Sequence, residues 1–244
     1  MINKLVLQNL INKYHLGIVQ SVNWSIKNKT ILIDFMDPSK EVIGNVEHTG
    51  FELEDCDLAV FDTKKLQNLI SITNGDLIVE LERNHLIPTK LKISDPNFNL
   101  TYRLGDPLLI DKVGTVNVPE WKNKIQVEVE DLENLIKAKK ALGEENNMFI
   151  ETTTNEDGDN VCQFIFGDEK EFDSKITYQL QGDINELGLK MPFNSELFKS
   201  ILYANKDMDT GTIYLTSTGL MKLNFISDNT TSEYFIVRKV GEDF

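Results

Sequence analysis

The chain has 244 residues, which is enough for one large domain or for two domains that each bury a core. Its 25 lysines and arginines stand against 39 aspartates and glutamates, and the net charge of −14 excludes a uniformly basic nucleic-acid-binding surface. No apolar run approaches the roughly 20 residues that cross a bilayer, and the two cysteines form no disulfide or zinc pattern. We therefore expect a soluble, cytoplasmic protein that binds no membrane.

Apolar residues at helical spacing predict four helices, over residues 4–14, 63–72, 131–142 and 195–206. Residues that cap helices support these bounds: Asp62 or Thr63 before the second, Asn194 or Ser195 before the fourth, and Gly143 after the third. The stretches between the helices alternate polar and apolar residues or run apolar, which predicts many short strands. The fold class is thus α+β, with helices packed on antiparallel sheets.

Two pairs of segments repeat at long range. FDTKKLQNLI at 61–70 matches FNSELFKSIL at 193–202, and LQNLI at 7–11 matches LENLI at 132–136. The offsets are close to half the chain, and the order of the segments is preserved, so we predict one domain present twice. The predicted bounds are an N-terminal domain over 1–110, a connector over 111–123 and a C-terminal domain over 124–244.

Positive charge is concentrated in the predicted helices. Their spans hold nine lysines and three acids, a balance of +6, which leaves −20 for the rest of the chain. Lys139 falls inside the apolar arc of its helix, and we expect its chain to snorkel. Basic helix faces suit sequence-independent contact with phosphates, although ordinary solvated lysines are the alternative at each position. The candidate DNA-facing residues are Lys4, Lys13, Lys64, Lys65, Lys137, Lys140, Lys199 and Lys206.

Four stretches, spread over the whole chain, carry a resemblance to a known family. They are DLAVFDTKKLQNLISI at 57–72, GDPLLIDKVGTVNVPEW at 105–121, VEVEDLENLIKAKKALG at 127–143, and SEYFIVRKV near a terminus that ends in Asp243 and Phe244. Together with the duplication and the basic helices, they resemble a DNA sliding clamp. The details are most similar to the clamp of T-even-like bacteriophages.

The resemblance implies a two-domain clamp fold, with two helices per domain packed on antiparallel sheets. It implies a homotrimeric ring that encircles duplex DNA and tethers the replicative DNA polymerase as a processivity factor. Its partners would be the polymerase, a clamp loader and, as for some phage clamps, late-transcription factors. We predict no cofactor, and a chain of viral origin would act in the host cytoplasm.

Clamps of this family also hold short apolar peptide tails in a surface pocket. The resemblance places this pocket near the connector, here Gly105 to Trp121, and near the carboxy terminus. Exposed aliphatic and aromatic residues are the usual anchors for such peptides, although the same side chains could simply pack the connector onto the domains. The candidate pocket residues are Leu108, Leu109, Ile110, Val113, Trp121, Tyr234, Ile236 and Phe244.

Sequence motifs of enzymes are missing. The chain has no P-loop, no Gly-x-Ser-x-Gly and no His-Glu-x-x-His, and its three histidines have no partner at metal-ligand spacing. The acidic runs at 52–57 and 156–159 do not follow a Ca²⁺ loop, and we interpret them as solvated strand edge and hairpin turn. We predict no catalytic residue and no metal. Two alternatives stay open: an acidic peptide-binding scaffold that never contacts DNA, and a carboxylate-dependent enzyme.

Overall fold

A computed structural model describes residues 1–118, 120–143, 146–167, 174–185 and 190–239. The chain forms two compact units. The first comprises residues 1–115 together with 229–232, and the second comprises the remainder. The chain passes from one unit to the other between Thr115 and Val116, inside the segment predicted as connector.

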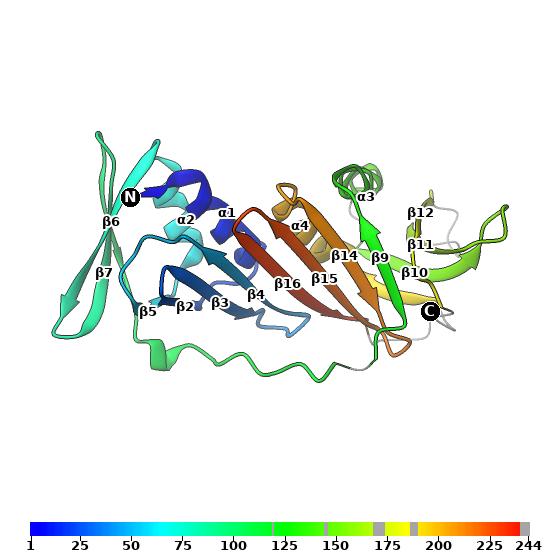
Figure 1. Cartoon of the computed structure of the whole chain (residues 1–244), viewed down its shortest axis with the longest axis horizontal. Coiled ribbons are helices and arrows are strands. Elements are labelled where there is room, and N and C mark those ends of the chain that lie inside the picture. The colour runs from blue at the N-terminus through cyan, green and yellow to red at the C-terminus, as the bar shows by residue number, and fades with distance from the viewer. Residues whose placement is uncertain (119, 144–145, 168–173, 186–189, 240–244) are drawn as a thin grey trace. The chain divides into compact units, whose positions relative to one another are not determined.

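The first unit contains strands of two antiparallel sheets and two α-helices (Figure 1). One sheet has the strand order β1-β6-β7-β8, and β5-β2-β3-β4 are neighbours in the other. The elements in chain order are β1 (Ile2–Asn3), α1 (Lys4–His15), β2 (Val22–Lys27), β3 (Thr30–Met36), β4 (Val42–Thr49), β5 (Cys56–Val60), α2 (Thr63–Ser71), β6 (Asp76–Asn84), β7 (Ile87–Ser94), β8 (Asn99–Arg103) and the 3₁₀ turn η1 (Pro107–Leu109).

The second unit has the same arrangement. One sheet has the order β12-β11-β10-β13, and β16-β15-β14-β9 are neighbours in the other. The elements are β9 (Asn123–Val127), α3 (Val129–Ala141), β10 (Asn147–Thr154), β11 (Asn160–Phe166), β12 (Ile176–Gln181), β13 (Met191–Asn194), α4 (Ser195–Ala204), β14 (Thr210–Leu215), β15 (Leu220–Ser227) and β16 (Thr230–Val237).

The two units follow one topological plan. Each begins with a strand and a helix, continues with four strands and a second helix, and ends with three strands. The repeated segments of the sequence fall at equivalent places, because one pair lies in α1 and α3 and the other starts α2 and α4. The repeated segments therefore mark equivalent elements of a duplicated fold.

Side chains fix where the helices begin. Asp62 accepts a hydrogen bond from the Lys65 N–H (2.8 Å), and Asn194 accepts bonds from the first-turn N–H groups of α4 (3.1 Å each), so both predicted caps are present. α3 begins two residues earlier than predicted, since the Asp131 carboxylate in its first turn accepts a bond from the Glu128 N–H (2.8 Å). α4 ends at Ala204, which leaves Lys206 just beyond it.

Apolar stripes hold each helix pair together. α1 contacts α2 and α3 contacts α4, each pair burying leucine and isoleucine at the predicted spacing. The repeated phenylalanines differ: Phe193 is 0% exposed, whereas Phe61 is 37% exposed and lies against Gly105, where a Cβ would be 1.5 Å from its ring. Equivalent positions thus bury unequal apolar area in the two units. No helix in the described part of the chain is long and apolar enough to cross a membrane.

Candidate functional site

The candidate DNA-facing lysines of the first unit occupy two environments. Lys64 and Lys65 are exposed on α2. Lys4 is half-buried, and its ammonium donates hydrogen bonds to the carbonyls of Ser71 (2.9 Å) and Thr73 behind the end of α2. These bonds join α1 to α2, so Lys4 has a structural role beside any contact with DNA.

Lys13 was predicted to face DNA, and that prediction is wrong. The residue is only 2% exposed, because the last turns of α1 are buried at every position from Leu10 to Leu16 except Asn12. A side chain enclosed in this way presents no charge to a polyanion. Helical periodicity alone places Lys13 near the polar face. In the structure, the end of the helix is buried on almost all sides, so this position is covered as well.

In the second unit, Glu196 of α4 organises two of the lysines. Its carboxylate pairs with Lys139 (2.6 Å) and with Lys199, and these two ammonium groups hold its pKa below the usual range. Lys139 is 1% exposed and also donates to the Gly143 carbonyl (2.7 Å). The prediction that Lys139 snorkels is wrong, because its ammonium is buried together with its stem, and its charge ties α3 to α4.

The remaining candidate DNA-facing lysines of the second unit are exposed. Lys137 lies 3.6 Å from Glu133, which offsets part of its charge. Lys140 on α3 and Lys206 after α4 have their ammonium groups 5.6 and 5.1 Å from the centroid of the Tyr203 ring. The cations least compensated by carboxylates are therefore Lys64 and Lys65 in the first unit and Lys140 and Lys206 in the second.

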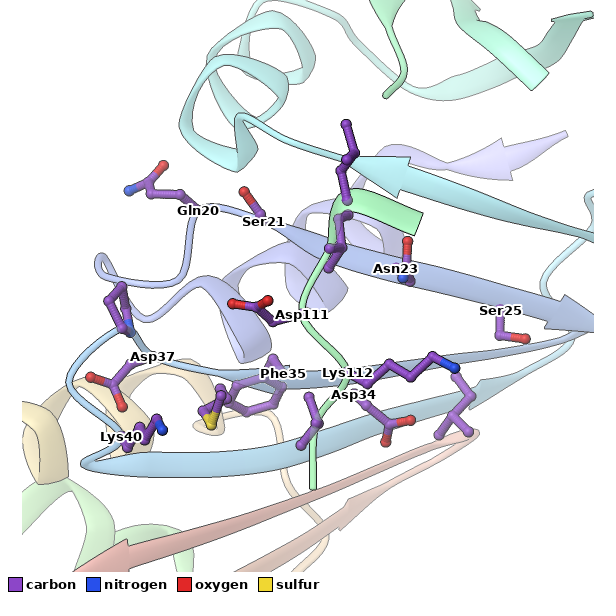
Figure 2. A pocket seen from close by; sticks show the side chains of 16 residues that line it. Gln20, Ser21, Asn23, Ser25, Asp34, Phe35, Asp37, Lys40, Asp111 and Lys112 are labelled. Carbon is purple, nitrogen blue, oxygen red and sulfur yellow. The ribbon is translucent and has the colours of Figure 1, made fainter. Parts of the chain in front are cut away.

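A cavity of about 560 Å³ opens in the first unit beneath the start of the connector. Three predicted pocket residues, Leu109, Ile110 and Val113, form one side of it. Figure 2 shows Asp111 and Lys112 on the same segment, and Asn23, Asp34 and Phe35 on the strands that it crosses. The cavity has the size typical of sites that take a small ligand or the anchoring side chains of a peptide.

Local hydrogen bonds hold the connector above this cavity. The Gly105 N–H donates to the Ala59 carbonyl (3.0 Å), Asp106 accepts from the Leu108 N–H (2.9 Å), and the Asn23 amide donates to the Pro107 carbonyl (3.3 Å). The connector therefore leaves the first unit at a fixed place. Leu109, Ile110 and Val113 line the space between the connector and the strands β2 and β3.

The rim of the cavity carries charge of both signs. Asp37 is buried, and its carboxylate is satisfied by the N–H groups of Ser39 (2.9 Å) and Val42 (2.8 Å), which makes it part of a turn. Asp34 is exposed at the rim, although partial burial raises the pKa of its carboxyl. The cavity thus offers apolar walls and an edge that can pair with polar or basic groups.

The other predicted pocket residues lie elsewhere. Tyr234 and Ile236 are 0% and 1% exposed, because alternate side chains of β16 point into the core of the second unit, and the prediction that they line a surface pocket is wrong. Trp121 is outside the cavity and packs against Tyr214 and Phe235, with ring centroids 5.6 and 6.5 Å away. Leu108 is 88% exposed and also outside it, and Phe244 lies outside the described residues.

Sequence reasoning missed the strand side of the cavity. Asn23, Asp34, Phe35 and Met36 line it, and they lie about eighty residues before the connector that completes it. The alternation of β2 and β3 indicates which residues share a face, but no local pattern indicates that a distant segment crosses that face. In the described part of the chain, no group of three or more metal-ligating side chains could hold a metal ion.

No protein-family model and no curated protein sequence matches this chain. Solved structures do match over nearly its full length. A PCNA chain from the structure of the C-terminal region of FEN-1 bound to A. fulgidus PCNA is similar with a TM-score of 0.78 and 15% identity, covering 99% of this chain and 98% of that one.

Two further PCNA structures agree. The PCNA2–PCNA3 complex from Sulfolobus tokodaii matches with a TM-score of 0.73 and 12% identity, covering 98% of each chain. Proliferating Cellular Nuclear Antigen from Entamoeba histolytica matches at 0.71 and 12%, covering 98% of this chain and 96% of that one. Identities this low establish the fold alone: this chain has the PCNA-type sliding-clamp fold, as the sequence resemblance predicted.

Proposed function

We propose that this protein is a sliding clamp, a ring that encircles duplex DNA and tethers the replicative DNA polymerase. The observation that carries the proposal is the likeness to PCNA chains over the whole length, with both units built on one plan. A tether of this kind performs no chemistry of its own. Its contribution is to keep the polymerase at high effective concentration on the template.

Two strands support a head-to-tail ring. In the described residues β8 pairs only with β7, and β12 pairs only with β11, so each leaves one side open at the end of its sheet. An open strand edge offers main-chain partners to another chain. Joining β8 of one copy to β12 of the next is a contact between unlike edges, which closes into a ring when the rotation allows. We propose a ring of three copies.

The helix lysines suit a sliding contact with DNA. In the proposed ring, the exposed residues Lys64, Lys65, Lys137, Lys140 and Lys206 face phosphates, while Lys4 and Lys199 contribute charge from partly buried positions. A few lysines in a chain of net charge −14 give weak, salt-dependent and sequence-blind attraction. Topological enclosure, rather than tight binding, then keeps the ring on DNA.

The cavity beneath the connector is the proposed dock for partner peptides. In one similar structure the C-terminal region of FEN-1 is bound to A. fulgidus PCNA, which supports a peptide-binding role for a chain of this fold. Here Leu109, Ile110 and Val113 would receive apolar anchors of the polymerase and the clamp loader. On the four stretches that resemble T-even-like phage clamps, we also propose a phage origin and a role in late transcription.

Reversing helix charges tests the contact with DNA. Lys64→Glu combined with Lys137→Glu changes one exposed lysine per unit, and we expect processive synthesis on a primed template, with polymerase and clamp loader present, to fall about tenfold or more. Lys27→Glu with Lys124→Glu is the matched control, because both lysines are exposed outside the helices. Equal processivity of the two double variants, with assembly intact, would disprove the assignment of the helices to DNA.

A second pair of variants tests the cavity. Ile110→Glu places a charge inside it, whereas Leu108→Glu makes the same change two residues away at an exposed position outside it. We expect the first variant to lose binding of the polymerase's carboxy-terminal peptide by about tenfold or more, and the second to bind like the unmodified protein. Equal binding by both would exclude this cavity as the dock.

A further inference from the structure

One exposed aromatic ring stands among the helix lysines of the second unit. Tyr203, in the last turn of α4, is 60% exposed. Lys140 reaches it from α3, with the ammonium nitrogen 5.6 Å from the ring centroid, and Lys206 reaches it from the residues after α4 at 5.1 Å. Two separate parts of the chain, α3 and the end of α4 with the residues after it, thus bring one ring and two cations together. We call these three residues the Tyr203 cluster.

The cations of this cluster differ from their neighbours. Lys137, Lys139 and Lys199 each pair with a glutamate on α3 or α4. Within the described residues no carboxylate pairs with Lys140 or Lys206, and the ammonium groups of both lie over the ring instead. Cation–π contacts at exposed sites are weak, so both ammonium groups can leave the ring for a phosphate.

The first unit has no such cluster among its described residues. At the offsets of the two sequence repeats, the positions equivalent to Tyr203, Lys140 and Lys206 are Ser71, His15 and Asn74. His15 is 4% exposed, and its Nδ1 lies 2.7 Å from the Val19 carbonyl oxygen. The aromatic and cationic residues therefore belong to one half of a duplicated surface. Maintenance of the fold does not require them, because the first unit has the same fold without them.

We infer that the Tyr203 cluster binds single-stranded DNA, with an unpaired base stacked on the Tyr203 ring and its phosphates held by Lys140 and Lys206. The inference rests on the proposed contact of the helices with DNA and extends it. In duplex DNA the faces of the bases are covered by their neighbours, so an aromatic side chain stacks only on a base that has left the helix. A ring on a primed template meets such bases where the single strand begins.

The chemistry of the cluster matches known single-strand platforms. These combine a basic path for the backbone with an aromatic ring for the bases, and replacing one such ring by alanine costs about 1–3 kcal/mol per base. The phenolic hydroxyl is not needed for stacking, whereas the ring is. Tyr203→Phe and Tyr203→Ala therefore separate stacking from other contributions of this side chain.

The test measures binding of a fluorescent 16-nucleotide oligothymidylate to the full chain at low salt. We expect Tyr203→Ala to weaken binding about 5- to 160-fold and Tyr203→Phe to change it less than twofold. Leu5→Ala on α1 is the matched control, since Leu5 is 66% exposed on a helix of the first unit, and we expect it to bind unchanged. In the unmodified protein, a 5-iododeoxyuridine placed in the oligonucleotide should photocross-link to Tyr203.

Two results would overturn the inference. One is equal binding of the oligonucleotide by the unmodified protein and by Tyr203→Ala, and the other is a cross-link that never maps to Tyr203. The processivity assay separates this failure from failure of the proposed function. A clamp that supports processive synthesis and lacks the Tyr203 effect contradicts only the single-strand site, whereas a Tyr203-dependent binder that never supports synthesis contradicts only the clamp.

Discussion

The two units share their order of strands and helices, yet their helix pairs are joined by different chemistry. In the first unit, the helices are connected by the Lys4 ammonium, which donates to carbonyls at the end of α2, and by the bond from the Gln67 amide to Asn12 (2.8 Å). In the second, the carboxylate of Glu196 holds Lys139 and Lys199. The apolar stripes and the caps are common to both units, which indicates that these positions specify the fold. The polar positions have diverged, and the proposed functions depend on them.

The largest expected effect comes from the repeated phenylalanines. Phe193→Ala removes a fully buried ring, and we expect the free energy of unfolding of the second unit to fall by about 3–5 kcal/mol. Phe61→Ala removes a partly exposed ring and should cost the first unit about 1 kcal/mol. Equal losses of unfolding free energy would show that the two phenylalanines are packed alike.

The cysteines allow the two units to be measured separately, because each unit contains one. Burial raises the pKa of the Cys162 thiol to about 12 and that of Cys56 to about 11, so neither is a thiolate in the folded protein near pH 8. In urea, thiol labelling at Cys162 reports opening of the second unit. Cys56 is only half-buried, so opening of the first unit is measured there as the increase in labelling rate over the rate without urea.

An intermediate effect is expected at Lys139. Lys139→Met keeps the buried stem but removes the charge that joins Glu196 to the end of α3, and we expect the second unit to lose about 1–3 kcal/mol in urea unfolding. Lys137→Met is the control, since its ion pair is exposed and should contribute about 0.3–0.5 kcal/mol. A cost for Lys139→Met no greater than for the control would contradict a structural role for Lys139.

The smallest expected effect is the pH dependence of the second unit. Lys139 and Lys199 lower the pKa of folded Glu196 below its unfolded value near 4.5, so the stabilisation is complete above pH 4.5 and disappears as the pH falls through the folded pKa. Solvent screening limits it to less than about 1 kcal/mol. Glu196→Gln should remove this part of the acid sensitivity, and a variant that loses stability as steeply as the unmodified protein would refute it.

Most of the fold could be predicted from the sequence, because its signals are local. The helix starts follow from Asp62 and Asn194, and the duplication follows from the two echoes. The candidate site depends on which face of an element is covered, and that is a property of the whole domain. Lys13 and Tyr234 were misplaced for this reason, since each is almost fully buried in the folded unit. Only the connector side of the cavity was predicted. The strand residues on its other side lie about eighty residues earlier in the sequence, and no local pattern connects them with the connector.

The central claim is a ring closed by unlike edges, and sedimentation equilibrium of edge variants tests it most directly. In each edge strand the N–H groups point alternately inward and outward, so proline is introduced at Leu100 or Thr101 in β8, and at Thr177 or Tyr178 in β12. From each pair, we use the variant whose circular dichroism spectrum is that of the folded protein. In that variant the proline has removed a backbone N–H that points away from the sheet, and the hydrogen bonds within the sheet are intact.

We predict that the unmodified protein sediments as three chains of 27.9 kDa and that each edge variant alone sediments as one. A mixture of the two variants should form a dimer and nothing larger, because only one intact β8 edge can then meet one intact β12 edge. A mixture that stays monomeric, or edge variants that assemble like the unmodified protein, would contradict the ring.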